Sequence, residues 1–82
     1  MSQEYASERE YLRDVINDIL NEKGDARSVE RLSDETSLTE DFGLDSLDLA
    51  EVTVRIEDRY GVDIFEDDIV DEVGEVLQKI ET

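Results

Sequence analysis

The sequence predicts an all-α domain, a small four-helix bundle with a long loop after the first helix and a short third helix. Apolar residues recur at intervals of three and four along most of the chain, which is the period of amphipathic helices. Pro is absent, and no stretch alternates between apolar and polar residues as a strand would. Because 82 residues support one small core, we expect residues 1–82 to form a single domain.

The first helix is expected at about residues 7–22. Ser7 and Glu10 have the spacing of an N-terminal capping box, and Gly24 stands where a left-handed C-terminal cap belongs. One helical face collects the apolar residues, which are Leu12, Val15, Ile16, Ile19 and Leu20. The pattern therefore predicts a helix with one buried face.

The helical period lapses from residue 23 to residue 41, where Gly, Ser, Thr and Asp are frequent. Val29, Leu32 and Leu38 nevertheless recur in this stretch. A loop of this length is uncommon unless it has a function or packing of its own. We expect these three side chains to pin the loop to the core.

The second helix is expected to begin near Asp45 or Ser46 and to end at Gly61, because acids and hydroxyls favour a helix start and glycine favours a C-cap. It carries two apolar stripes. One holds Leu49, Val52, Ile56 and Tyr60, and the other holds Leu47, Ala50 and Val54. If the first stripe faces the core, the second is exposed among acidic residues, which is typical of a helix that docks with a partner. Burial of both stripes by neighbouring helices is the alternative.

Two further helices are expected after Gly61. Residues 62–70 contain Ile64 and a run of three acids, which indicates a short third helix of one or two turns. The last helix follows from the helical spacing of Val73, Val76, Leu77 and Ile80.

The composition excludes several classes of function. With 25 acidic and 8 basic residues the net charge is −17, so nucleic acid is excluded as a partner by like charge. The absence of His and Cys removes the usual proton shuttle, thiol nucleophile and zinc ligands, so we expect neither an enzyme nor a metal site. An EF-hand starting at Asp41 would have Ser46 and Val52 where Gly and Glu belong.

The same composition indicates a folded protein in the cytoplasm. Leu, Ile, Val and Phe number 24 of 82, enough to collapse a chain despite its charge. No apolar leader segment and no stretch of about 18 apolar residues occurs, so we expect no membrane contact and a cytoplasmic location. We also expect a monomer.

The segment from Asp41 to Asp48 places a glycine turn, an acid and a hydroxyl at the start of the second helix. Ser46 would be exposed there, and the first N–H groups of the helix would face an anion attached to it. That arrangement suits a phosphodiester. Taken alone, a serine or aspartate at this position is more often only a helix cap.

The run Phe42-Gly43-Leu44-Asp45-Ser46-Leu47-Asp48 resembles the attachment motif of acyl carrier proteins, in which aspartate-serine-leucine follows a hydrophobic residue, a glycine and any residue. The similarity extends over about residues 12–80 and includes Val73-Gly74-Glu75 at the start of the last helix. It implies that a separate phosphopantetheinyl transferase uses coenzyme A to attach 4'-phosphopantetheine to Ser46. The thiol of this arm would carry the acyl group as a thioester. Asp45 would position Ser46 and contact the transferase, and Leu47 would belong to the same site.

The resemblance also implies a docking surface for the basic patches of acyl-loading, synthase and transferase enzymes. Its expected residues are Leu47, Asp48, Ala50, Glu51, Val54, Glu57, Asp58 and Ile64. Val52, Ile56, Ile64 and Ile69 are the candidates for lining a cavity that shelters the acyl chain. Charge supports docking independently, because residues 41–82 hold 14 acids and 3 bases and would attract basic partners.

Two alternatives stay open. The chain could be a peptidyl or aminoacyl carrier of a nonribosomal peptide or related pathway, although Leu44 stands where such carriers more often have a second glycine. It could also be an unmodified acidic helical interaction module in which Ser46 is only a cap.

Overall fold

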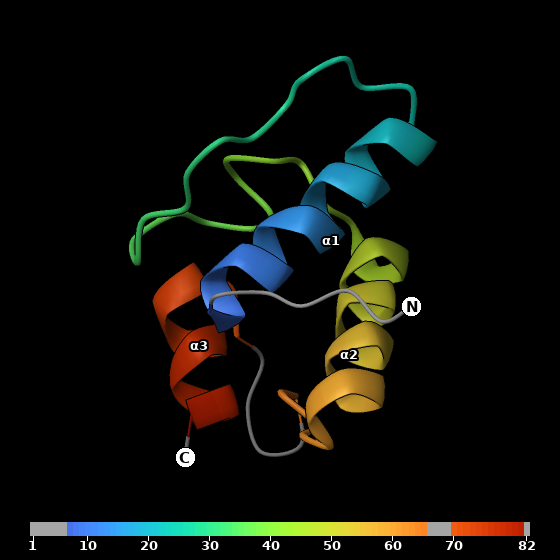
Figure 1. Ribbon diagram of the computed structural model, residues 1–82. Helices are drawn as coiled ribbons and strands as arrows, with labels where there is room; N and C mark the ends of the chain where they lie inside the picture. Colours follow the sequence, from blue (N-terminus) through green and yellow to red (C-terminus); the bar gives the residue numbers. More distant parts are fainter. Residues whose placement is uncertain (1–6, 66–69, 82) are drawn as a thin grey trace.

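The computed structural model describes residues 7–65 and 70–81, and these residues form three helices (Figure 1). They are α1 (Glu8–Glu22), α2 (Ser46–Tyr60) and α3 (Val73–Glu81). The all-α class is therefore confirmed, whereas the four-helix count is not. The expected short third helix falls largely on residues 66–69, which lie outside the described residues, and Ile64 and Phe65 immediately before them form a turn. None of the described helices is long and apolar enough to cross a membrane.

Helix α1 begins and ends at the residues that its capping signals predict. Ser7 has an extended backbone, and its Oγ accepts a hydrogen bond from the Glu10 N–H at 3.3 Å. After the helix, Gly24 adopts the left-handed conformation with φ of 79°. The Gly24 N–H donates to the Asn21 carbonyl and the Asp25 N–H donates to the Leu20 carbonyl. These two bonds form a Schellman motif, which reverses the chain directly after α1.

Helix α1 is the centre of the core because it packs against both α2 and α3 (Figure 1). Its five predicted core residues are all buried. They meet Val52 and Ile56 of α2 and Val73, Val76 and Leu77 of α3. At one edge, the Tyr11 and Tyr60 rings make an edge-to-face contact with centroids 5.6 Å apart, which joins α1 to the end of α2.

The long loop between α1 and α2 runs back along α1 (Figure 1). Side chains on three successive turns of α1 donate hydrogen bonds to loop carbonyls. The pairs are Arg9 with Leu32 at 2.8 Å, Arg13 with Glu30 at 3.2 Å, and Asn17 with Val29 at 3.0 Å. Leu32 and Leu38 are buried and Val29 is half-buried, which confirms that they pin the loop to the core. These three loop carbonyls thus accept hydrogen bonds from side chains of α1 in place of a neighbouring strand.

The end of this loop is tied to the segment before α3. Ser37 and Glu72 form an antiparallel β-bridge, and the Leu38 N–H donates to the Asp71 carbonyl at 2.8 Å. The Asp71 carboxylate accepts hydrogen bonds from the Ser37 hydroxyl and from the N–H and hydroxyl of Thr39. Burial raises the pKa of Asp71, but these hydrogen bonds outweigh it and hold the pKa below its usual value.

Candidate functional site

Ser46 is the first residue of α2, and the helix cap is supplied by its neighbour Asp45. The Asp45 carboxylate accepts a hydrogen bond from the Asp48 N–H at 3.0 Å, and the Asp48 carboxylate accepts one from the Asp45 N–H at 3.0 Å. This reciprocal capping box satisfies both of those N–H groups. The Ser46 side chain takes no part in it and is exposed. Ser46 is therefore not a cap, and its hydroxyl faces solvent.

The start of α2 fits a phosphodiester on Ser46. A helix begins with four N–H groups that have no partner within the helix, and the capping box uses those of Asp45 and Asp48. Within the described residues, no acceptor is bonded to the N–H groups of Ser46 and Leu47. These two groups and the positive end of the dipole of a 15-residue helix favour an anion next to Ser46.

The residues before Ser46 hold it at the surface by burying their own side chains. Leu44 is buried, with 3% of its surface exposed, and Phe42 packs against the core. Between them, Gly43 has φ of 67°, a conformation that L residues with a side chain rarely adopt. The Leu44 N–H donates to the Leu38 carbonyl at 3.2 Å and closes the loop. The chain therefore approaches α2 along one fixed path, and the three predicted attachment residues, Asp45, Ser46 and Leu47, lie together at the helix start.

Two cations contact this site, one from the C-cap of α1 and one from the loop after it, and the sequence analysis missed both. Lys23 Nζ lies 2.6 Å from Asp48 Oδ2 and donates to the Gly43 carbonyl at 3.0 Å. The hydrogen bond from Lys23 lowers the pKa of Asp48, and the same contact raises the pKa of Lys23. Arg27 donates to the carbonyls of Asp41 and Phe42. The available signal was the position of these two cations on either side of Gly24 in a chain with 8 basic residues.

The second apolar stripe of α2 is exposed, so the alternative in which both stripes are buried is wrong. Leu47 is 80% exposed and Val54 is 64% exposed, whereas Val52 and Ile56 on the other face are fully buried. The other predicted docking residues of α2 lie in or beside this stripe. Ala50, Glu57 and Asp58 are exposed, and Asp48 and Glu51 are half-buried.

Ile64 requires a correction. It was expected on the docking surface, but its side chain is fully buried and belongs to the core. The Gly61 C-cap, with φ of 71°, turns the chain away from the α2 axis, and Ile64 then packs inward. Ile64 therefore stays a candidate only for the interior, with Val52 and Ile56, while Ile69 lies outside the described residues.

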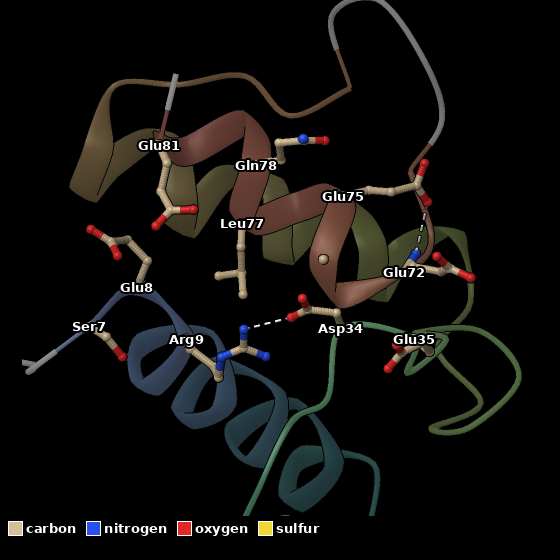
Figure 2. A pocket seen from close by; sticks show the side chains of 11 residues that line it. Ser7, Glu8, Arg9, Asp34, Glu35, Glu72, Glu75, Leu77, Gln78 and Glu81 are labelled. Carbon is tan, nitrogen blue, oxygen red and sulfur yellow. Dashed lines mark hydrogen bonds and ion pairs between the residues drawn. The ribbon is translucent and has the colours of Figure 1, made fainter.

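A surface hollow of about 530 Å³ lies away from Ser46, between the start of α1, the loop and α3 (Figure 2). The Arg9–Asp34 ion pair, 2.6 Å long, lies in it. The rest of its lining is mainly acidic, with Glu8, Glu35, Glu72, Glu75 and Glu81. No residue of the attachment segment lines it. Over the described ranges, acidic side chains nowhere gather in a group of three or more that could hold a metal ion.

Comparison with known proteins identifies the family of the chain. Residues 10–79 match the family described as phosphopantetheine attachment site. An acyl carrier protein of Nitratidesulfovibrio vulgaris is 46% identical over 41 residues, which cover 50% of this chain and 54% of that protein. The polyketide-8 synthase acyl carrier protein 2 of Streptomyces avermitilis is 36% identical over 61 residues, which cover 74% of this chain and 64% of that protein.

The chain thus spans about half the length of the first of these relatives and less than two thirds of the second. No solved structure gives a significant match. The matched family range contains the whole of α2 and the loop that leads to it. Because this range covers most of the chain, the chain belongs to the phosphopantetheine attachment site family.

Proposed function

We propose that this protein is an acyl carrier protein, which holds acyl intermediates as thioesters on a 4'-phosphopantetheine arm attached to Ser46. The observation that carries the proposal is the exposed Ser46 hydroxyl at the start of α2, where Asp45 supplies the cap and leaves the serine available. The acyl carrier proteins of Nitratidesulfovibrio vulgaris and Streptomyces avermitilis support the same function by their similarity. The protein itself carries a substrate and catalyses no reaction, as expected of this family.

The chain's own residues supply position and charge to this function. The N–H groups of Ser46 and Leu47 would hold a phosphodiester oxygen, and the arm supplies the thiol that the chain lacks. A tethered acyl group is presented at high effective concentration to each enzyme that docks with the carrier. The Asp45 carboxylate is also exposed to a modifying transferase beside Ser46.

The proposed docking surface is the exposed face of α2. Leu47, Ala50 and Val54 provide an apolar stripe of the kind that contacts a partner, and Glu57 and Asp58 flank it with negative charge. Basic patches on a phosphopantetheinyl transferase and on acyl-loading, synthase and transferase enzymes would complement this surface. We also propose that the protein is a cytoplasmic monomer.

The test is the intact mass of the protein after incubation with coenzyme A and a promiscuous phosphopantetheinyl transferase. The parent is expected to gain one phosphopantetheine group and Ser46→Ala none. Ser28→Ala is the matched control, because Ser28 is another exposed serine in the same chain, and this variant should be modified like the parent. Modification of Ser46→Ala would refute the site, and a folded parent that stays unmodified would favour the interaction module.

A further inference from the structure

Three consecutive backbone carbonyls before the attachment serine accept hydrogen bonds from cations. Arg27 Nη1 donates to the Asp41 carbonyl at 2.8 Å, and Arg27 Nη2 donates to the Phe42 carbonyl at 3.1 Å. Lys23 Nζ donates to the Gly43 carbonyl at 3.0 Å. The cations come from the segment directly after α1, so the contacts join parts of the chain that are 14 to 20 residues apart.

Lys23 also reaches across Ser46 to the helix. Its ammonium lies 2.6 Å from Asp48 Oδ2, the oxygen that accepts the Asp45 N–H. A single group therefore joins the turn before Ser46 to the first turn of α2 after it. Hydrogen bonds with a charged donor or acceptor are stronger than neutral ones, and every contact that Lys23 and Arg27 make with residues 41–48 has a charged donor.

Arg27 is itself held in place. Its guanidinium contacts both carboxylate oxygens of Asp25, with Nη2 at 2.8 Å, and the Arg27 N–H donates to the same carboxylate at 2.9 Å. Asp25 is fixed in turn, because its N–H closes the Schellman motif that ends α1. The brace, defined as Lys23 and Arg27, is thus anchored on the C-terminal cap of α1.

We infer that the brace positions Ser46 for attachment of the arm, so that Lys23 and Arg27 are positioning residues that never touch the arm's reacting atoms. This inference rests on the proposed function. A turn with a glycine at φ of 67° can adopt other conformations when its carbonyls are released. If only a fraction of the molecules present Ser46 correctly, the apparent affinity for the transferase falls to that fraction of its intrinsic value.

The experiment measures KM and kcat for modification by a promiscuous phosphopantetheinyl transferase with coenzyme A. Lys23→Met and Arg27→Gln each remove part of the brace, and both are expected to raise KM for the carrier on the order of fivefold with little change in kcat. Lys23→Arg keeps the charge and should restore KM to within about twofold of the parent.

Arg9→Gln is the matched control. Arg9 also pairs with an aspartate and donates to a carbonyl of the same loop, but at the Leu32 end, away from Ser46. It makes the same change in net charge as Arg27→Gln. More negative charge alone should favour docking with a basic transferase, so a rise in KM that is absent from Arg9→Gln identifies the brace.

A second readout does not depend on the transferase. Amide hydrogen exchange of residues 43–45 in the unmodified protein should speed up in Lys23→Met and Arg27→Gln and stay unchanged in Arg9→Gln. Parent-like KM and exchange in both brace variants would overturn the inference, and so would equal changes in the Arg9 control. A parent that is not modified at all would count against the proposed function instead. The exchange data alone would then decide whether Lys23 and Arg27 hold residues 43–45 in place.

Discussion

Asp45 and Ser46 are adjacent, yet the structure separates their contributions to stability and to modification. Asp45→Ala removes the carboxylate that accepts the Asp48 N–H at 3.0 Å. Ser46→Ala removes a hydroxyl that does not cap the helix. We therefore expect the first variant to be less stable than the parent and the second to keep its stability while losing the attachment point.

The expected magnitudes follow from the capping box. Loss of an aspartate N-cap costs about 0.5–2 kcal/mol, typically about 1 kcal/mol. For a domain of this size, about 1 kcal/mol corresponds to a fall in Tm of roughly 4–8 °C. Ser46→Ala should change the free energy of unfolding by less than about 0.5 kcal/mol, because alanine favours the helix interior at least as well as serine does.

Asp45→Asn sharpens the comparison, because asparagine caps a helix about as well as aspartate but carries no charge. We expect it to retain the stability of the parent. If the transferase requires the Asp45 carboxylate, as the proposed function has it, Asp45→Asn will be folded and poorly modified. The contribution of Asp45 to helix capping and its contribution to recognition by the transferase are thereby measured separately.

The assays are urea unfolding followed by circular dichroism and intact mass after incubation with the transferase. The reasoning is refuted if Ser46→Ala loses as much stability as Asp45→Ala, since Ser46 would then be part of the cap. It is also refuted if Asp45→Ala unfolds at the same urea concentration as the parent.

Three further predictions concern the core, the docking surface and the loop. Ile64→Ala should lower the free energy of unfolding by about 2–5 kcal/mol in urea unfolding, because Ile64 is fully buried; a loss below about 1 kcal/mol would contradict its core position. Leu47→Ala and Val54→Ala should each change stability by less than about 0.5 kcal/mol but raise KM with partner enzymes, and an unchanged KM for both would count against the docking surface. Asp71→Ala should cost about 1–3 kcal/mol at pH 7, through the lost hydrogen bonds from Ser37 and Thr39. Because folding lowers the pKa of Asp71, this contribution is present above about pH 4 and is lost as the pH falls further, so the stabilities of parent and variant should converge in acid.

The helix ends were predictable because each depends on residues that are close in sequence. Ser7 and Gly24 bound α1, and Asp45 and Gly61 bound α2, where the signals placed them. Helical period alone separates the apolar residues of α2 into two stripes, whereas the exposure of the second stripe is seen only in the structure. Local rules therefore determine the bounds of α1 and α2 and the placing of Ser46, the proposed attachment serine, at a helix start.

Local rules did not predict the burial of Ile64. Its apolar side chain fits a docking surface or a core equally well, and the choice depends on how the chain turns after Gly61. The contacts of Lys23 and Arg27 were hidden for another reason. Their acceptors include backbone carbonyls, which every residue has, so the sequence shows two cations beside Gly24 but not which carbonyls, 14 or more residues away, they contact.

The position of the cations explains how so acidic a chain keeps both its fold and negative charge on the proposed docking surface. Arg9, Lys23, Arg27 and Arg55 all pair with acids, and Arg9, Lys23 and Arg27 also donate to loop carbonyls. Asp48 and Glu51 of α2 are paired with Lys23 and Arg55. Over the described residues, Glu57 and Asp58 take part in none of these ion pairs, so these two acids supply the negative field of the exposed α2 face. Exposed ion pairs each contribute little to stability, whereas attraction of a basic partner depends on the whole field. Added salt should therefore weaken docking without weakening the fold, because the core of α1, α2 and α3 is apolar and screening reduces the self-repulsion of a chain with net charge −17.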